Sequence, residues 1–261
     1  MRVSVFASGS SGNCLLVSDA GTNILIDAGI SMRRVEAALA QIGLTMRDIG
    51  GVLITHEHSD HISGLKMLCK YHRVPVYAPR TVAIHLWRSL PETDGCLVSV
   101  PAGQSFHIGT LGLCAFHTPH DTDESVGYRV EGAGVFALAT DMGHVSGEVR
   151  EGLGGAGTVM IESNHDEQML CTGPYPAYLK RRILSDHGHL SNAACAVLAR
   201  ELAEEGTGHI ILGHLSRENN RPQLALAASR QALGSLNAQL YCAPEAGCLT
   251  VPVEKREPCF L

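Results

Sequence analysis

The sequence predicts an α/β (α+β) protein, because patterns typical of buried strands alternate with helix patterns along much of the chain. Short apolar runs typical of buried strands occur at 51–54, 158–161 and 209–213. The longest helix pattern spans 192–205, and a serine and an asparagine at its start suit a helix N-cap. Each of the three strands ends in polar residues, and the carboxyl ends of strands are where an α/β sheet builds its site.

The first part of the chain supplies strands and one capped helix. Residues 2–7 predict a strand, and the small residues at 8–13 suit a tight hairpin better than an anion-binding loop. Another buried strand ends at Asp27, which we expect to brace a metal ligand rather than to bind the ion itself. Ser31 then caps a helix that ends at Gly43.

The middle and the end of the chain predict shorter strands and a last helix. Residues 97–117 form short alternating patterns broken by glycine, which suit an antiparallel half-sheet. The segments 125–130 and 134–139 predict a hairpin. A helix at 222–234 and a strand at 247–252 complete the expected elements.

Composition favours one folded domain over residues 1–261, since neither a linker nor a low-complexity segment interrupts the chain. With 45% hydrophobic and 18% charged residues, the chain can bury a sizeable core. No apolar run is long enough to span a membrane, and the apolar start is too short for a signal peptide. The nine cysteines include no C-x-x-C pair and are typical of the reduced thiols of a cytoplasmic protein.

The net charge of −6 argues mildly against a nucleic-acid-binding surface, which is usually basic. Two bound divalent cations would add a charge of about +4 to a cleft lined by carboxylates. The net charge of the chain therefore does not exclude a nucleic-acid substrate.

Residues 55–61, Thr-His-Glu-His-Ser-Asp-His, contain four strong metal ligands directly after a buried strand. Residues two apart in an extended chain point to the same side, so His56 and His58 project together. Asp60 and His61 form a second pair where the chain turns into a helix pattern. Imidazole and carboxylate suit zinc, manganese or iron. The segment therefore predicts two neighbouring divalent ions, Zn²⁺ or Mn²⁺, rather than a polar loop.

Three later residues follow strands and extend this ligand set. His120 follows a strand and a proline that helps to fix its loop, so it suits a third ligand to the first ion. The carboxylate of Asp141 can bridge two cations with one oxygen for each. His214 directly follows the strand at 209–213. A helical zinc-protease motif is excluded, because H-E-x-x-H requires a histidine where Asp60 stands.

Other histidines are interpreted as structural. His117 is expected to be a strand residue, and His144 is a weaker candidate for an extra ligand. His72, His85 and Trp87 lie in apolar sequence surroundings and are interpreted as structural.

The motif T-H-x-H-x-D-H resembles the signature of the metallo-β-lactamase-fold hydrolases. The resemblance implies an αββα sandwich of two mixed β-sheets flanked by helices, with a dinuclear metal site at one edge. It implies that one ion is bound by His56, His58 and His120, the other by Asp60, His61 and His214, and that Asp141 bridges them.

A more specific resemblance, to the YycJ/WalJ-like exonucleases, covers nearly the whole chain. It rests on the residues at 8–13, 162–166, 175–183, 188–192 and 214–219. This resemblance implies a cytoplasmic, metal-dependent exonuclease that digests DNA from the 5′ end.

Site chemistry and this resemblance together assign further roles. We expect two ions to polarise a phosphodiester while Asp60 orients or deprotonates the attacking water. His189, paired with Glu162, would protonate the leaving oxygen or contact its phosphate. The candidate substrate contacts are Asn164, His165 and Arg217.

Several alternatives stay open at this point. The order of motifs is also that of tRNase Z, but Ile161 stands where that enzyme has a histidine. A small-molecule phosphodiester or thioester hydrolase could use the same metal site, and a regulatory metal-binding module would lack turnover. The basic run at 180–182 is either a solvated helix face or a grip on phosphates. We expect a nucleic-acid partner, DNA rather than RNA, and no membrane; a homodimer is left open.

Overall fold

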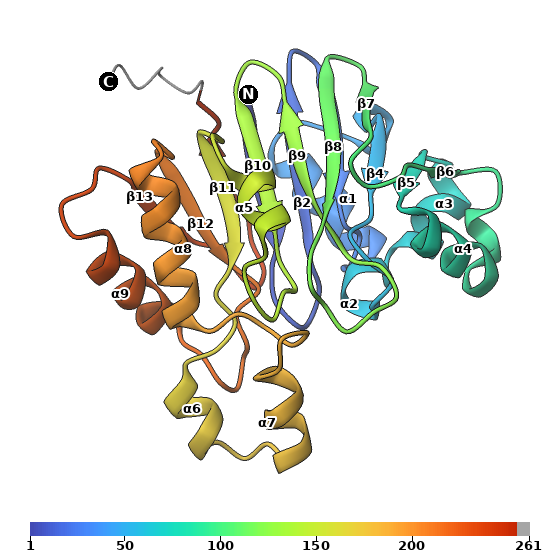
Figure 1. Cartoon of the computed structure of the whole chain (residues 1–261). Helices are drawn as coiled ribbons and strands as arrows, with labels where there is room; N and C mark the ends of the chain where they lie inside the picture. The colour runs from blue at the N-terminus through green and yellow to red at the C-terminus, as the bar shows by residue number, and fades with distance from the viewer. Residues whose placement is uncertain (255–261) are drawn as a thin grey trace.

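The computed structural model describes residues 1–254 as two β-sheets packed face to face, with helices on both outer faces (Figure 1). The predicted sandwich of two mixed sheets is therefore confirmed. One domain over residues 1–261 stays a prediction, and residues 255–261 lie outside the described residues.

The first sheet has antiparallel pairing among its strands near the N-terminus and parallel pairing beyond them. In spatial order its strands are β14 (Leu249–Pro252), β1 (Arg2–Ala7), β2 (Cys14–Asp19), β3 (Thr22–Ile26), β4 (Gly51–Leu53), β5 (Val76–Ala78) and β6 (Leu97–Ser99).

The second sheet repeats this plan, with an antiparallel meander followed by parallel strands. In spatial order its strands are β13 (Gln239–Cys242), β12 (His209–Gly213), β11 (Thr158–Glu162), β10 (Val135–Ala139), β9 (Val126–Glu131), β8 (Leu111–His117) and β7 (Ser105–Ile108).

Helices connect the parallel strands and cover the two outer faces of the sandwich (Figure 1). Those of the first half are α1 (Met32–Gln41), α2 (Ser59–Ile62), α3 (Leu65–His72) and α4 (Arg80–Ser89), with 3₁₀ turns η1 (Met46–Asp48) and η2 (Pro91–Thr93). Those of the second half are α5 (Gly147–Leu153), α6 (Glu167–Thr172), α7 (Ala177–Ile183), α8 (Asn192–Glu204) and α9 (Pro222–Leu233).

Three apolar layers hold the sandwich together. One lies between the sheets, where Tyr128 and Phe136 are fully buried. The other two pack each sheet against its helices, as Leu39 of α1 and Leu198 of α8 illustrate. The central strands, such as β11 and β12, therefore bury both of their faces, which explains the continuous apolar runs in the sequence. No helix among residues 1–254 is long and apolar enough to cross a membrane.

Several details differ from the sequence predictions. The strand at 97–99 pairs in parallel with β5 of the first sheet, so the predicted antiparallel half-sheet at 97–117 is wrong in its first part. Strand β13 was not predicted, since its residues are only half-buried. Trp87 is 60% exposed on α4 and does not pack in the core.

A buried hydroxyl links the second sheet to the chain just before the metal-ligand motif. The Tyr128 hydroxyl of β9 donates a 2.8 Å hydrogen bond to the Ile54 carbonyl. Tyr128→Phe should lower the free energy of unfolding by about 1–3 kcal/mol, because a buried carbonyl loses its partner. Urea denaturation measures this change, with Tyr71→Phe at an exposed tyrosine as the matched control. Equal losses in both variants would contradict the assigned role of this bond.

Candidate metal centre

The predicted metal ligands converge at one end of the sandwich, where strands of both sheets end. His56 and His58 lie in the loop after β4, and α2 carries Asp60 and His61. The second sheet supplies the others from the loops that follow its strands, namely His120 after β8, Asp141 after β10 and His214 after β12.

Three residues of this region have a left-handed backbone at or near a strand end. The φ angles are 59° at Asp27, 57° at Asp141 and 53° at His214. Aspartate and histidine adopt this conformation more readily than most residues, and such strain concentrates at functional sites. The turn redirects each side chain from the sheet into the site.

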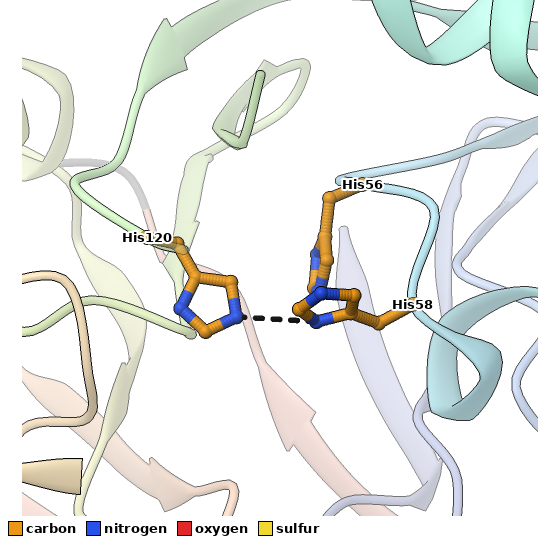
Figure 2. Close-up of side chains that lie close together, drawn as sticks. All are labelled: His56, His58 and His120. Carbon is orange, nitrogen blue, oxygen red and sulfur yellow. Dashed lines mark hydrogen bonds between the residues drawn. The ribbon is translucent and has the colours of Figure 1, made fainter. Parts of the chain in front are cut away.

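One cluster consists of His56, His58 and His120, whose potential ligand atoms all lie within 4.8 Å of one another. His120 Nε2 lies 3.3 Å from His58 Nδ1. Figure 2 shows His120 facing the other two rings from a separate loop. The proline-containing loop of the second sheet thus completes a three-histidine set begun by the first sheet.

A second cluster consists of Asp60, His61 and His214, again with ligand atoms within 4.8 Å of one another. Asp141 lies between the two clusters. One of its oxygens lies 3.3 Å from His61 Nε2 and the other lies 3.4 Å from His214 Nε2 and 3.8 Å from His120 Nε2. The Asp141 carboxylate thus lies within reach of histidines from both clusters.

Hydrogen bonds fix which nitrogen of each ring faces the site. His61 Nδ1 lies 2.7 Å from the Asp27 carboxylate, and His214 Nδ1 lies 3.0 Å from Glu162. His120 Nδ1 lies 3.3 Å from the Gly188 carbonyl. Because each partner is an acceptor, the proton resides on Nδ1 and the Nε2 lone pair points into the cluster.

The unpaired atoms fit divalent cations. Within the described residues, His56 Nε2 and Asp141 Oδ2 are buried and accept no hydrogen bond. Buried polar atoms are usually paired, and a cation bound at the clusters would give both atoms a partner. The charge of the site also favours a cation. Burial alone would lower the pKa of His214, but Asp141, Asp60 and Glu162 raise this pKa to about 10. The site thus attracts positive charge.

Glu162 is a fully buried carboxylate that organises one side of the centre. It accepts hydrogen bonds from His189 Nδ1 at 2.7 Å and from the backbone N–H of Met142 at 2.9 Å, besides its contact with His214. Burial would raise the pKa of Glu162, but His189 and His214 lower it overall. Burial would likewise lower the pKa of His189, but Glu162 raises it. Glu162 thus stays ionised and favours the protonated form of His189.

A pocket of about 240 Å³ opens onto the two clusters. His189, Asp60 and Asn164 line it, as the predicted roles require. The lining also includes Arg182, from the basic run that the sequence offered as a possible grip on phosphates, together with Ser10, Asp121, Tyr175 and Ser216, to which the sequence assigned no place in the pocket.

The three predicted substrate contacts occupy different positions. Asn164 lines the pocket and donates to the His214 carbonyl at 3.0 Å. His165 is 1% exposed, and neither ring nitrogen has a hydrogen-bond partner among the described residues. Arg217 is exposed and pairs with Glu245 outside the pocket lining. Only Asn164 therefore faces the pocket directly, and the roles of the other two stay predictions.

Asn13 is a positioning residue that sequence reasoning missed. Its side-chain amide lies 3.1 Å from His61 Nε2 and 3.4 Å from Asp60 Oδ2. The segment at 8–13 does join β1 to β2 as the predicted hairpin, but it also packs against α2. The small residues before Asn13 were a signal for this close approach.

Residues 22–214, which include both clusters, match a family model described as a beta-lactamase superfamily domain. The chain belongs to the metallo-β-lactamase-fold superfamily. The prediction of a hydrolase of this fold is therefore confirmed.

Two relatives match this superfamily member along most of its length. Exodeoxyribonuclease YycJ of Bacillus anthracis is 39% identical over 237 residues, which cover 89% of each chain. Exodeoxyribonuclease WalJ of Streptococcus pneumoniae is 36% identical over 228 residues, covering 86% of this chain and 85% of the relative. Zn²⁺-bound PqqB from Methylobacterium extorquens shares the metallo-β-lactamase fold, with a TM-score of 0.73 at 15% identity over 97% of this chain and 100% of that one.

Asp27 braces the centre through His61 and Thr55. Its carboxylate lies next to His61 Nδ1 and accepts a 2.9 Å hydrogen bond from the backbone N–H of Thr55. Asp27→Asn should weaken metal binding about 10- to 100-fold, because the amide is a poorer acceptor for the His61 N–H. Competition with a chromophoric chelator measures the affinity. Asp94→Asn, at an exposed acid outside the site, is the control. Unchanged affinity in Asp27→Asn would contradict the bracing role.

Proposed function

We propose that this protein is a dinuclear-metal-dependent phosphodiesterase that digests DNA in the 5′-to-3′ direction. The observation that carries the proposal is the coincidence of two ligand clusters around Asp141 with relatives named exodeoxyribonucleases that match most of the chain. A cytoplasmic location remains a prediction from the sequence, and a homodimer is left open.

The proposed ligands follow the two clusters, with Asp141 between them. Their imidazole and carboxylate atoms suit Zn²⁺ or Mn²⁺. The first ion would be held by His56, His58 and His120, the second by Asp60, His61 and His214. When bound, such a pair of ions polarises a phosphodiester and favours deprotonation of water.

The chain's own groups supply orientation and proton transfer. The Asp60 side chain is 22% exposed and lines the pocket, so its carboxylate can accept a hydrogen bond from the attacking water. His189 Nδ1 is held by Glu162, which leaves Nε2 as the nitrogen that can donate to the leaving oxygen. Proton donation by a positioned histidine contributes about 10²- to 10⁴-fold to a rate.

Substrate contacts are proposed at Asn164, His165 and Arg217. The amide of Asn164 faces the pocket and can bind a phosphate oxygen. Arg217, on the rim, would have to exchange its contact with Glu245 for a contact with the strand. His165 would act from within the wall of the site, since it is fully buried.

Digestion of 5′-phosphorylated, 3′-labelled DNA and RNA by protein loaded with Mn²⁺ or Zn²⁺ tests the function. We expect stepwise shortening of DNA, loss of activity in a chelator and recovery on adding metal back. Asp60→Ala should abolish the activity without unfolding the chain, whereas Asp94→Ala should retain it. Cleavage of RNA alone would instead favour an RNA-processing nuclease, and cleavage of small esters alone a small-molecule hydrolase.

Two substrates whose leaving groups differ in their need for a proton test the role of His189. His189→Gln should lower kcat on DNA at least about 100-fold, because the leaving alkoxide then lacks its proton donor. Hydrolysis of bis(p-nitrophenyl) phosphate should fall far less, since p-nitrophenolate leaves without a proton. Equal losses on both substrates would contradict the assignment of His189 as the general acid.

A further inference from the structure

The helical hairpin of α6 and α7 projects beyond the sandwich at the end that carries the metal centre (Figure 1). The inner side of this hairpin forms one wall of the pocket, through Tyr175, Leu179, Arg182 and Ile183. Any polymer that leaves the pocket on this side must therefore pass over α7.

Two of the three cations in the basic run fix this hairpin in place. The Lys180 ammonium donates to the Cys171 carbonyl of α6 at 2.7 Å. The Arg182 guanidinium pairs with Asp121, the residue next to the proposed metal ligand His120. The position of α7 is thus tied directly to the metal-binding loop.

The outer side of α7 carries an aromatic ring and a free cation. Tyr178 is 69% exposed, and Arg181 is exposed without a hydrogen bond or ion pair among residues 1–254. Residues three and four apart on a helix are neighbours, so Tyr178 lies beside both Arg181 and the pocket-lining Arg182. An exposed ring with arginines beside it, continuous with a catalytic pocket, is the combination that binds an unpaired nucleic-acid strand.

We propose that Tyr178 and Arg181 bind unpaired nucleotides of the DNA strand whose end lies in the pocket. Tyr178 stacks on a base, and Arg181 contacts the backbone phosphate beside that base. The strand runs from the two metal clusters past Arg182 and across the outer side of α7. This inference rests on the proposed nuclease function and adds the surface that holds the polymer.

Binding of a fluorescent, phosphorothioate-linked single-stranded oligodeoxynucleotide to the metal-loaded protein tests the proposal by anisotropy. Tyr178→Ala should raise the Kd about tenfold, whereas Tyr178→Phe, which keeps the ring, should bind nearly as the wild type does. Arg181→Ala should make log Kd depend less steeply on log salt concentration. The decrease in slope should correspond to the loss of about one phosphate contact. The matched control is Tyr71→Ala, because Tyr71 is a 58% exposed tyrosine beside Lys70 on α3, away from the pocket.

Parallel digestion assays distinguish the two proposals. If the wild type digests DNA but Tyr178→Ala binds within twofold of the wild type, the surface on α7 is wrong and the nuclease function stands. If Tyr71→Ala raised the Kd as much as Tyr178→Ala did, the proposed binding surface on α7 would also be wrong. If the wild type neither binds nor digests DNA, the nuclease function fails and the inference fails with it.

Discussion

Acceptor atoms that face one another inside a buried cluster determine how this site is built. His61 Nε2 lies 3.3 Å from an oxygen of Asp141, and His120 Nε2 lies 3.3 Å from His58 Nδ1. Such acceptors repel one another unless a cation or a proton lies between them. The two divalent ions proposed above would satisfy all of them at once, because each ion would lie between acceptors that now face one another.

The fold maintains this unfavourable arrangement from outside the cluster. Asp27 and Glu162, both buried, hold the outer nitrogens of His61 and His214. Each acid lies at the end of a strand in a different sheet, so the packing of the sandwich sets the distance between the two ligand clusters. Glu162 also holds His189 and thereby couples the proposed proton donor to the metal-binding framework. Loss of either acid should therefore affect more than one function of the site.

The sequence pointed to residues that the fold brings together where the signal is local, and it gave no signal for contacts between remote residues. The residues at 55–61 show their ligand spacing within seven positions, and Pro119 marks His120 as a fixed loop residue. The partnership of Asp121 with Arg182 spans 61 residues and left no periodic signal. The short strand at 97–99 carries too few residues to show whether it pairs in parallel or antiparallel. Trp87 illustrates a further limit, since an apolar neighbourhood in sequence does not place a helical residue on the buried face.

We propose that this centre holds two ions joined by Asp141. Anomalous diffraction from crystals grown with Mn²⁺ or Zn²⁺ would locate each ion independently of activity. We expect two anomalous peaks about 3.5–4 Å apart, with one oxygen of Asp141 on each. A single peak at full metal loading, or two ions without Asp141 between them, would contradict the account.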